Sequence, residues 1–320
     1  MSALAYDKKV LSLAIQAKAK EEGFLGCGIS KADLLENADQ KLSEWLNRKF
    51  HGEMEYMQRN REKRADPRKL VPGARSVISF LYNYYPAKDI SKSSEYKISK
   101  YAWGRDYHFV IKRKLKEIMK MIRQSTGLNN HRVFVDSAPV MDKVWAERSG
   151  LGWIGKNTCL LNRKHGSFFF IGEIITEAEL LYDEQKQHDL CGSCTRCLRA
   201  CPTGALTQAY MIDANKCISY LTIEYKKETL PEHLKENFNG WIFGCDICQD
   251  VCPWNRMSEP HREAAFEPGE QLKQMTSEDW EKLDKETFNK IFKHSAVKRT
   301  KYSGLKRNIR FVAAKDLPRE

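Results

Sequence analysis

Ten cysteines are the residues of this 320-residue chain whose types and spacing most clearly suggest chemistry. Four of them form a C-x2-C-x2-C-x3-C run, with a proline directly after the fourth: Cys191, Cys194, Cys197 and Cys201. This run is typical of bacterial ferredoxins, whose thiolates hold [4Fe–4S] clusters. A structural zinc site more often uses two separated C-x2-C pairs, so zinc is the weaker interpretation.

A second group of cysteines repeats the end of this run. Cys245, Cys248 and Cys252 again have a proline after the last cysteine, and Cys217 is the candidate for the missing first ligand. In two-cluster ferredoxins the fourth cysteine of each run binds the other cluster. This rule predicts two [4Fe–4S] clusters, one held by Cys191, Cys194, Cys197 and Cys252 and the other by Cys201, Cys217, Cys245 and Cys248. Clusters of this kind move single electrons, so we expect an electron acceptor elsewhere in the chain.

Cys27 and Cys159 are left over, and both lie in apolar stretches of sequence. Such surroundings favour a role as small packing residues over a role as ligands.

The elements that must position the cysteines begin with a mixed α/β region over residues 1–185. Apolar spacing predicts helices over 8–23, 39–50, 54–64, 106–125 and 139–150, and strands over 24–30, 76–86, 132–137 and 167–176. Residues 186–256 form a two-cluster ferredoxin-like module, and residues 257–320 a connector and a short basic α-helical tail. The expected fold class is therefore α+β.

The charge of the chain is basic and uneven. Lys and Arg outnumber Asp and Glu by 54 to 42, a formal charge of +12, and residues 285–320 hold eleven Lys and Arg against three Asp and Glu. Such clustering favours a polyanionic partner such as nucleic acid. A solvated helical tail and an acidic membrane or protein surface are the alternatives. No secretory segment and no apolar run of membrane-spanning length is apparent, so we expect a soluble cytoplasmic protein with no membrane partner.

Two glycine motifs suggest nucleotide binding but lack the necessary context. Gly150, Gly152 and Gly155 spell G-x-G-x-x-G, and the stretch from Gly150 to Lys156 spells G-x4-G-K. A dinucleotide fingerprint follows a strand and opens a helix, whereas here a helix precedes the glycines and an extended stretch follows. A P-loop also needs Ser or Thr after its lysine, where this chain has Asn157. The glycines instead indicate a loop whose backbone lies close to a bulky group, or a purely structural turn.

Several segments together resemble one enzyme family. The segments "MQRNREKRADPRKLVPGARSVI", "YAWGRDYH", "VDSAPVMDK" and "SGLGWIGKNTCLL", followed by the split ferredoxin runs, closely resemble the epoxyqueuosine reductases. The similarity covers roughly residues 10–310. The resemblance implies a base-off cobalamin that works with the two [4Fe–4S] clusters, as in the related reductive dehalogenases. It also implies that the first region is a cobalamin-binding domain, and that the reaction reduces the epoxide of epoxyqueuosine at the tRNA wobble position.

One absence in the sequence is compatible with cobalamin that has no histidine ligand. Corrinoid proteins that ligate cobalt through histidine carry D-x-H-x-x-G, and residues Asp106 to Ile111 have the first two positions but lack the glycine.

Asp136 is the expected proton donor. It follows the predicted strand 132–137, and open α/β sheets place ligand-binding residues at strand ends. A helix N-cap in "DSAP" is an equally good reading of the residues alone, and the resemblance favours the donor. Half protonation at pH 7 requires that the pKa of an aspartic acid rise by about three units, or roughly 4 kcal/mol. Burial and nearby negative charge supply such a shift, so an exposed Asp136 could not be the acid.

The remaining expectations concern the cofactor and the partners. The resemblance implies cobalamin contacts from Arg59, Ser137, Trp153, Ile154, Gly155, Lys156 and Asn157. The partners would be tRNA carrying epoxyqueuosine and a reductant of the flavodoxin or ferredoxin type. Longer family members continue into helical repeats that grip tRNA, and residues 304–317 look like the first such helix, which leaves open how far this tail contributes to RNA binding.

Two other function classes are alternatives for this sequence. One is a ferredoxin-fused reductase that uses a flavin or another prosthetic group on a small molecule. The other is an electron-carrying or RNA-binding adaptor without enzymatic activity.

Overall fold

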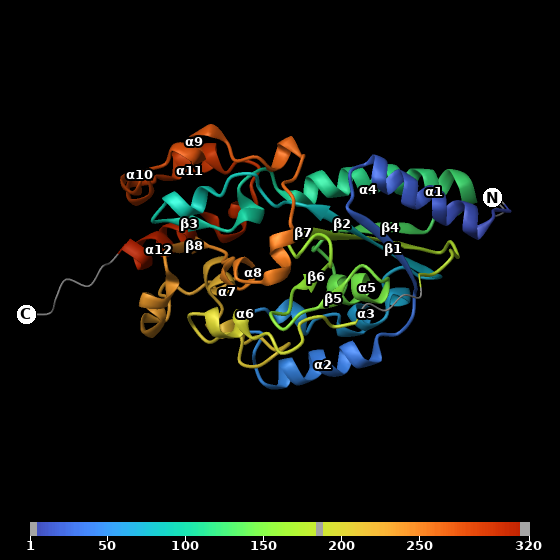
Figure 1. Ribbon diagram of the computed structural model, residues 1–320, viewed down its shortest axis with the longest axis horizontal. Coiled ribbons are helices and arrows are strands. Elements are labelled where there is room, and N and C mark those ends of the chain that lie inside the picture. The colour runs from blue at the N-terminus through green and yellow to red at the C-terminus, as the bar shows by residue number, and fades with distance from the viewer. Residues whose placement is uncertain (1–4, 184–187, 314–320) are drawn as a thin grey trace, which may run out of the picture.

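The computed structural model describes residues 5–183 and 188–313. Its front part is built on one four-stranded sheet with the order β1-β2-β7-β4 (Figure 1). The strands are β1 (Gly26–Lys31), β2 (Ser76–Asn83), β4 (His131–Phe134) and β7 (Phe169–Thr176). All three neighbouring pairs are antiparallel, and the central pair places Ser79 opposite Glu173.

Helices cover both faces of this sheet, as Figure 1 shows. On one face lie α1 (Lys8–Glu21) and α4 (Tyr107–Thr126), and on the other lie α2 (Glu36–Asn47), α3 (Arg61–Ala65) and α5 (Asp142–Arg148). Successive strand residues point to opposite faces. Accordingly Ile78 of β2 packs in the core with Ile111 of α4, while its neighbour Val77 packs with Trp145 of α5.

The predicted helices and strands of this region are present, with two local corrections. Residues 54–64 form a short 3-10 turn (Glu55–Met57) and α3 in place of one helix, because Asn60 between them adopts a left-handed backbone with φ 55°. The sheet is antiparallel, so the strand-end rule for open parallel sheets does not explain the position of Asp136. "DSAP" is not a helix cap either, since the N-cap of α5 is Met141.

The eight cysteines between residues 191 and 252 lie in a compact module beside this sheet (Figure 1). It contains α6 (Arg196–Ala200), α7 (Ile218–Ile223), β8 (Trp241–Phe243) and α8 (Ile247–Asp250). A short hairpin of β5 (Trp153–Ile154) and β6 (Leu160–Leu161) precedes the module in sequence, and β3 (Lys97–Ile98) pairs in parallel with β8. Buried Lys100 ties the front part to the module, since its ammonium lies 2.8 Å from Asp250 and 3.5 Å from Asp246.

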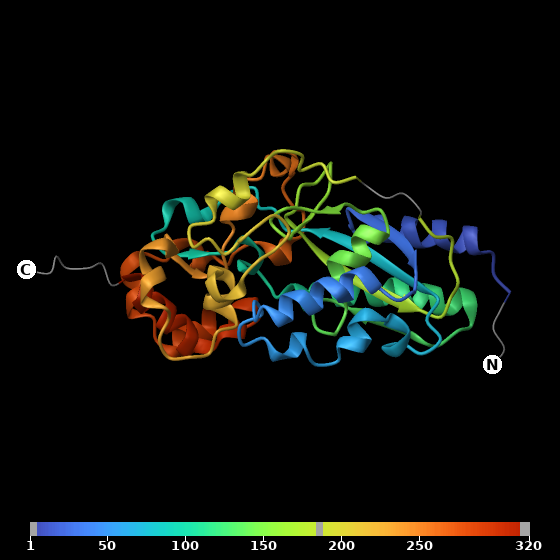
Figure 2. The ribbon, with the colours of Figure 1, turned by 90° about the horizontal axis from the view of Figure 1, so that it is seen from below.

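The last part of the described chain is helical. It comprises α9 (Glu270–Gln274), α10 (Ser277–Lys282), α11 (Lys285–Ile291) and α12 (Lys301–Ala313). Helix α12 buries Leu305, Asn308 and Ile309, and the Asn308 amide donates to the carbonyls of Thr222 and Ile242, both at 2.8 Å. The alternative that the basic end of the chain is a solvated helical tail is therefore wrong for α12. The end of the predicted helix 304–317 lies outside the described residues. Helices α1 and α12 lie at opposite ends of the long axis (Figures 1 and 2).

Side chains from all three regions predicted from the sequence pack together. The boundaries of these regions stay a prediction. Trp103, Phe243 and Leu305 belong to one hydrophobic core, although they come from the first, second and third region. No helix in the described part of the chain is long and apolar enough to cross a membrane.

Candidate functional site

The structure brings the cysteines together in two groups, and all ten are free thiols. The first group lines a cavity of about 330 Å³ and consists of Cys191, Cys194, Cys197 and Cys252. The thiol of Cys252 interacts electrostatically with Cys191 and Cys197, although it follows them by more than fifty residues. The last cysteine of the second run thus lies with the first three cysteines of the first run.

The second group has the reciprocal composition. The Cys245 thiol interacts electrostatically with Cys217 and Cys201, and the Cys248 thiol with Cys245 and Cys217. Cys201 of the first run has therefore crossed to the second group. Within residues 5–183 and 188–313, no three Cys, His, Asp or Glu side chains are arranged to hold a single metal ion. The thiolates of a [4Fe–4S] cube bind separate irons and need not converge on one point.

Residues 153–157 lie against the loops of both groups. Buried Trp153 lies beside Cys191, although its indole N–H has no hydrogen-bond partner among the described residues. The Lys156 ammonium donates to the carbonyls of Gly192 and Cys194, and the buried Asn157 amide donates to the Cys248 carbonyl at 3.4 Å. Two of the predicted cobalamin-contact residues thus use their polar groups to position cysteine loops.

The other two predicted contact residues of this segment are held by its own turn. The Ile154 N–H donates to the Glu147 carboxylate, and the Gly155 N–H donates to the Cys159 carbonyl, both at 2.8 Å. A Cβ on Gly155 would lie 2.5 Å from a Leu161 methyl group. The bulky neighbour that the glycines accommodate is therefore β6 of the same hairpin.

The two remaining cysteines lie in different places. Cys27 packs against the main core, which agrees with the expected packing role. The Cys159 thiol interacts electrostatically with that of Cys248, so it lies beside the second cysteine group.

Asp136 follows β4 on a strained and exposed turn. Its backbone has φ 44°, a left-handed conformation that is uncommon for residues other than glycine. The Tyr107 hydroxyl donates to its carboxylate at 2.6 Å, and the Tyr107 ring stacks on Phe170 with centroids 4.2 Å apart. The Asp136 side chain is exposed. The protein without bound partners therefore does not provide the burial that a proton-donating aspartic acid needs.

A buried carboxyl pair lies close to Asp136, and sequence reasoning missed it. Asp142 at the start of α5 lies close to Glu173, which is fully buried in the middle of β7, and neither Glu173 carboxyl oxygen has a hydrogen-bond partner among the described residues. Burial raises the pKa of Asp142 to about 6 and raises the pKa of Glu173 well above its usual range, and both carboxyls also interact with Asp136. Burial and a neighbouring carboxyl both disfavour ionisation, so the two groups do not readily ionise together. The available signal was the position of Glu173, inside an apolar run that a central strand would bury.

Two arginines other than the predicted one surround Asp136. Arg64 is buried, interacts with Asp136 and Asp142, and has an Nε that finds no acceptor among the described residues. Arg299 interacts with Asp136 and also binds the Glu224 carboxylate through two contacts of 3.0 Å. The predicted Arg59 is exposed on the turn before α3.

Ser137 follows Asp136 and is also exposed. Its hydroxyl accepts from the Lys112 ammonium at 2.9 Å.

Two aromatic side chains, buried Tyr84 and half-buried Tyr101, lie between the second cysteine group and Asp136. The Tyr84 hydroxyl interacts electrostatically with Cys159 and with Tyr101, and Tyr101 interacts with Asp136. The tyrosines therefore connect the side of the second cysteine group to Asp136. An α/β domain joined to two groups of ferredoxin-type cysteines defines an iron–sulfur oxidoreductase as the class of protein.

Comparisons with known proteins identify the family. Residues 190–255 match the family model "4Fe-4S double cluster binding domain", and residues 64–137 match "Epoxyqueuosine reductase QueG, DUF1730". The chain is 54% identical to epoxyqueuosine reductase of Cyclobacterium marinum, over 93% of this chain and 95% of the relative. It is 42% identical to that of Escherichia coli, over 83% of this chain and 71% of the relative. The chain belongs to the epoxyqueuosine reductase family.

Solved structures of this family have the same fold. An epoxyqueuosine reductase crystallised with an epoxyqueuosine-modified tRNA-Tyr stem loop matches with a TM-score of 0.84 at 26% identity, over 95% of this chain and 81% of that one. The Bacillus subtilis enzyme, in a state with its catalytic aspartate loop swung out of the active site, matches with a TM-score of 0.85 at 27% identity and the same coverage.

Proposed function

We propose that this protein reduces the epoxide of epoxyqueuosine at the wobble position of tRNA to give queuosine. The observation that carries the proposal is the family relationship over 93% of the chain, at 54% identity to a named epoxyqueuosine reductase. The arrangement of the site supports it, because the two cysteine groups lead through tyrosines toward a carboxyl group.

The eight grouped cysteines are the proposed ligands of two [4Fe–4S] clusters. The crossed grouping is the arrangement of two-cluster ferredoxins, in which each run supplies one ligand to the other cluster. The hydrogen bonds from Lys156 to the carbonyls of Gly192 and Cys194 suit this role, because donors near cluster loops tune reduction potentials.

Cobalamin, which the resemblance implies, is the proposed electron acceptor beside Asp136. The Arg64 Nε fits this group, since it is a buried donor without a partner and the rim of a corrin carries amide oxygens. When bound, cobalamin would supply a strongly reducing cobalt centre. The contacts predicted for Arg59, Ser137 and residues 153–157 remain part of this proposal.

Asp136 is the proposed proton donor to the epoxide oxygen, with Tyr107 as the residue that orients it. The exposed carboxyl would need to be covered by the bound nucleoside and cofactor. The left-handed backbone of Asp136 suits a loop that can adopt more than one conformation. The catalytic aspartate loop of the Bacillus subtilis enzyme has been seen swung out of its active site. The Asp142–Glu173 pair keeps a proton within electrostatic reach of Asp136 and is the proposed source from which it is reprotonated.

The proposed RNA-binding surface is a basic groove of about 1190 Å³ between residues 223–235 and α12. It is lined by Lys226, Lys227, Lys235, Arg299, Lys301, Lys306, Arg307 and Arg310. Arg299 also interacts with Asp136, so the groove leads toward the proposed active site. Cations along such a track would bind phosphates, while the target base is unstacked from its loop to reach the active site.

The test is conversion of the modified nucleoside. Reduced, cobalamin-loaded protein is mixed without oxygen with tRNA that contains epoxyqueuosine, and the digested nucleosides are analysed by mass spectrometry. We expect queuosine to replace epoxyqueuosine. Protein that contains its iron and cobalamin yet leaves the nucleoside unchanged would contradict the proposal.

A further inference from the structure

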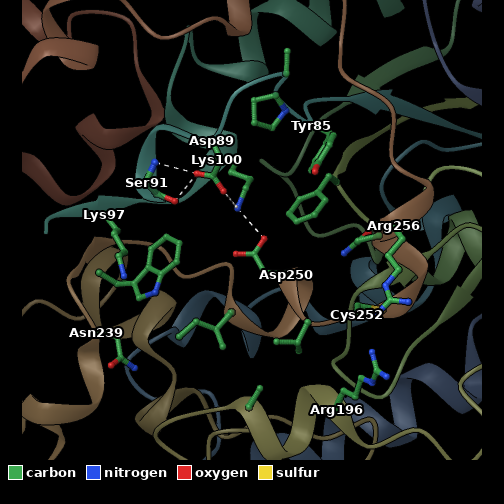
Figure 3. A pocket seen from close by; sticks show the side chains of 18 of the residues that line it. Tyr85, Asp89, Ser91, Lys97, Lys100, Arg196, Asn239, Asp250, Cys252 and Arg256 are labelled. Atoms are coloured by element: carbon green, nitrogen blue, oxygen red, sulfur yellow. Dashed lines mark hydrogen bonds and ion pairs between the residues drawn. The ribbon is translucent and has the colours of Figure 1, made fainter. Parts of the chain in front are cut away.

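A groove of about 1160 Å³ lies beside the first cysteine group, and Figure 3 shows it from close by. Cys252 and Arg196 line both this groove and the cavity of the first cysteine group. The groove and the proposed site of the first cluster therefore share a wall. In Figure 3, Arg256 lies next to Cys252 on this wall, and Arg196 lies on the α6 side of it.

The groove carries an excess of positive charge. Its acidic residues Asp89 and Asp250 are already paired with buried Lys100, at 3.2 and 2.8 Å. The other four cations are Lys97, Arg196, Arg199 and Arg256, and none of them has a carboxylate partner among the residues that the structure describes. The three arginines are exposed, so their charge is available to a partner.

Exposed apolar side chains lie at the same place. Leu190 and Met257 line the cavity of the first cysteine group, and 41% and 58% of their surface is exposed. An apolar centre with a charged rim is typical of protein interfaces, and transient redox complexes use small interfaces of this kind.

The first cysteine group is also the outer of the two. Its cavity is bordered by exposed Leu190, Arg196 and Met257. Cys217 of the second group instead packs among buried residues of α7, and this group adjoins Cys159 on the way to Asp136. Electrons that enter the protein from outside would therefore reach the first group before the second.

We propose that this face docks an acidic one-electron carrier protein, which reduces the first cluster; the proposal rests on the function proposed above. Each encounter oxidises one carrier and transfers one electron. Two encounters supply the two electrons that open the epoxide, and two protons complete the alkene product and one water molecule. The observations favour a carrier over RNA here, because none of the residues that line the basic groove of α12 lines this one.

The test uses the double variant Arg199→Glu/Arg256→Glu. Turnover of epoxyqueuosine tRNA is driven either by a bacterial flavodoxin, kept reduced by its NADPH-dependent reductase, or by reduced methyl viologen. We expect the KM for flavodoxin to rise at least about tenfold at low salt and to lose most of its salt dependence, because steering between opposite charges is removed. Turnover with methyl viologen and the KM for tRNA should stay unchanged.

The matched control is Lys116→Glu/Lys120→Glu, which reverses two exposed charges on α4 and should change neither assay. An unchanged KM for flavodoxin in the double variant would overturn the proposal. A raised KM for tRNA with an unchanged KM for flavodoxin would also overturn it, and would assign the groove to RNA.

The two proposals can fail separately. If the natural protein makes no queuosine with either reductant, the proposed function fails, and docking is then measured by stopped-flow bleaching of the clusters with reduced flavodoxin. Bleaching at least about tenfold slower in the double variant would support the docking face, and equal rates would overturn it.

Discussion

Asp136 combines features that are hard to explain by packing alone. Its backbone is left-handed, its side chain is exposed, and its carboxylate accepts from a tyrosine that is held by ring stacking. A left-handed backbone outside glycine motivates a functional hypothesis, and six other non-glycine residues of the described chain share it. At the scale of single residues, the orientation by Tyr107 is the part of the proposed mechanism that the chain itself provides.

The substitution Asp136→Asn tests the proposed acid. The amide keeps the shape of the side chain but cannot deliver the proton, so we expect the single-turnover rate to fall by about 10²- to 10⁴-fold. The iron content, cobalamin binding and tRNA affinity should not change. Glu117→Gln on the exposed face of α4 is the control, and a variant at position 136 that turns over at the full rate would remove Asp136 from the mechanism.

The buried pair of Asp142 and Glu173 predicts a pH dependence of stability. The pKa of Asp142 is raised by burial from 3.8 to about 6, and that of Glu173 is raised in the same direction. A carboxyl whose pKa is higher in the folded state stabilises the fold while it is protonated, and this contribution is lost as the pH rises through the folded pKa. We therefore expect a loss of stability between about pH 4 and pH 7 from this pair.

The substitution Glu173→Gln measures this effect. A neutral amide removes the second acid and can donate to the Asp142 carboxylate. The free energy of unfolding of the variant, relative to that of the natural protein, should therefore be about 1–3 kcal/mol higher at pH 8 than at pH 5. The readout is the difference in melting temperature between variant and natural protein at both pH values. A difference that is the same at pH 5 and pH 8 would show that the pair does not titrate in this way.

Residue identities were only partly predictable around Asp136. The cysteine spacing predicted the crossed grouping, because ferredoxin runs have fixed spacing and a known rule of exchange. The sequence does not predict that Arg64 and not Arg59 lies near Asp136, since the break at Asn60 turns the two arginines to different surroundings. The close approach of Asp142 and Glu173 is not predictable either, because it depends on how α5 packs on the sheet.

At the scale of elements, apolar periodicity predicted the strands and long helices of the front part. Helix α4 is an example, because Ile111, Leu115, Ile118 and Ile122 form one buried stripe. The direction of the strands was not predictable in this way, since a buried strand has the same pattern in parallel and antiparallel sheets. The antiparallel order therefore appears only in the structure.

The basic face of α12 leads to a prediction about RNA binding. Lys226 and Arg310 are exposed in the groove, and each phosphate that they neutralise would release counterions. The double substitution Lys226→Glu/Arg310→Glu should weaken tRNA binding and make the slope of log affinity against log salt shallower by about 2. Affinity is measured between low and physiological salt, with Lys116→Glu/Lys120→Glu as the control. An unchanged salt slope would exclude these two side chains from phosphate contacts.

At the scale of the whole molecule, the cluster module and the front domain are packed as one unit. Strand β3 of the front part pairs with β8 of the module, and Lys100 joins the two through Asp246 and Asp250. The composition of the sequence indicated the order of the regions but not this packing, because pairing between distant strands leaves no local pattern. The consequence is that the second cysteine group is held at a fixed position relative to the tyrosines and Asp136.

The iron content of protein purified without oxygen tests the central claim most directly. Two [4Fe–4S] clusters require about eight irons per chain, and Cys252→Ser should reduce this number toward four while the second group keeps its cluster. Asp136→Asn, which changes no proposed ligand, should keep the full number. A natural protein with far fewer than eight irons per chain would contradict the account.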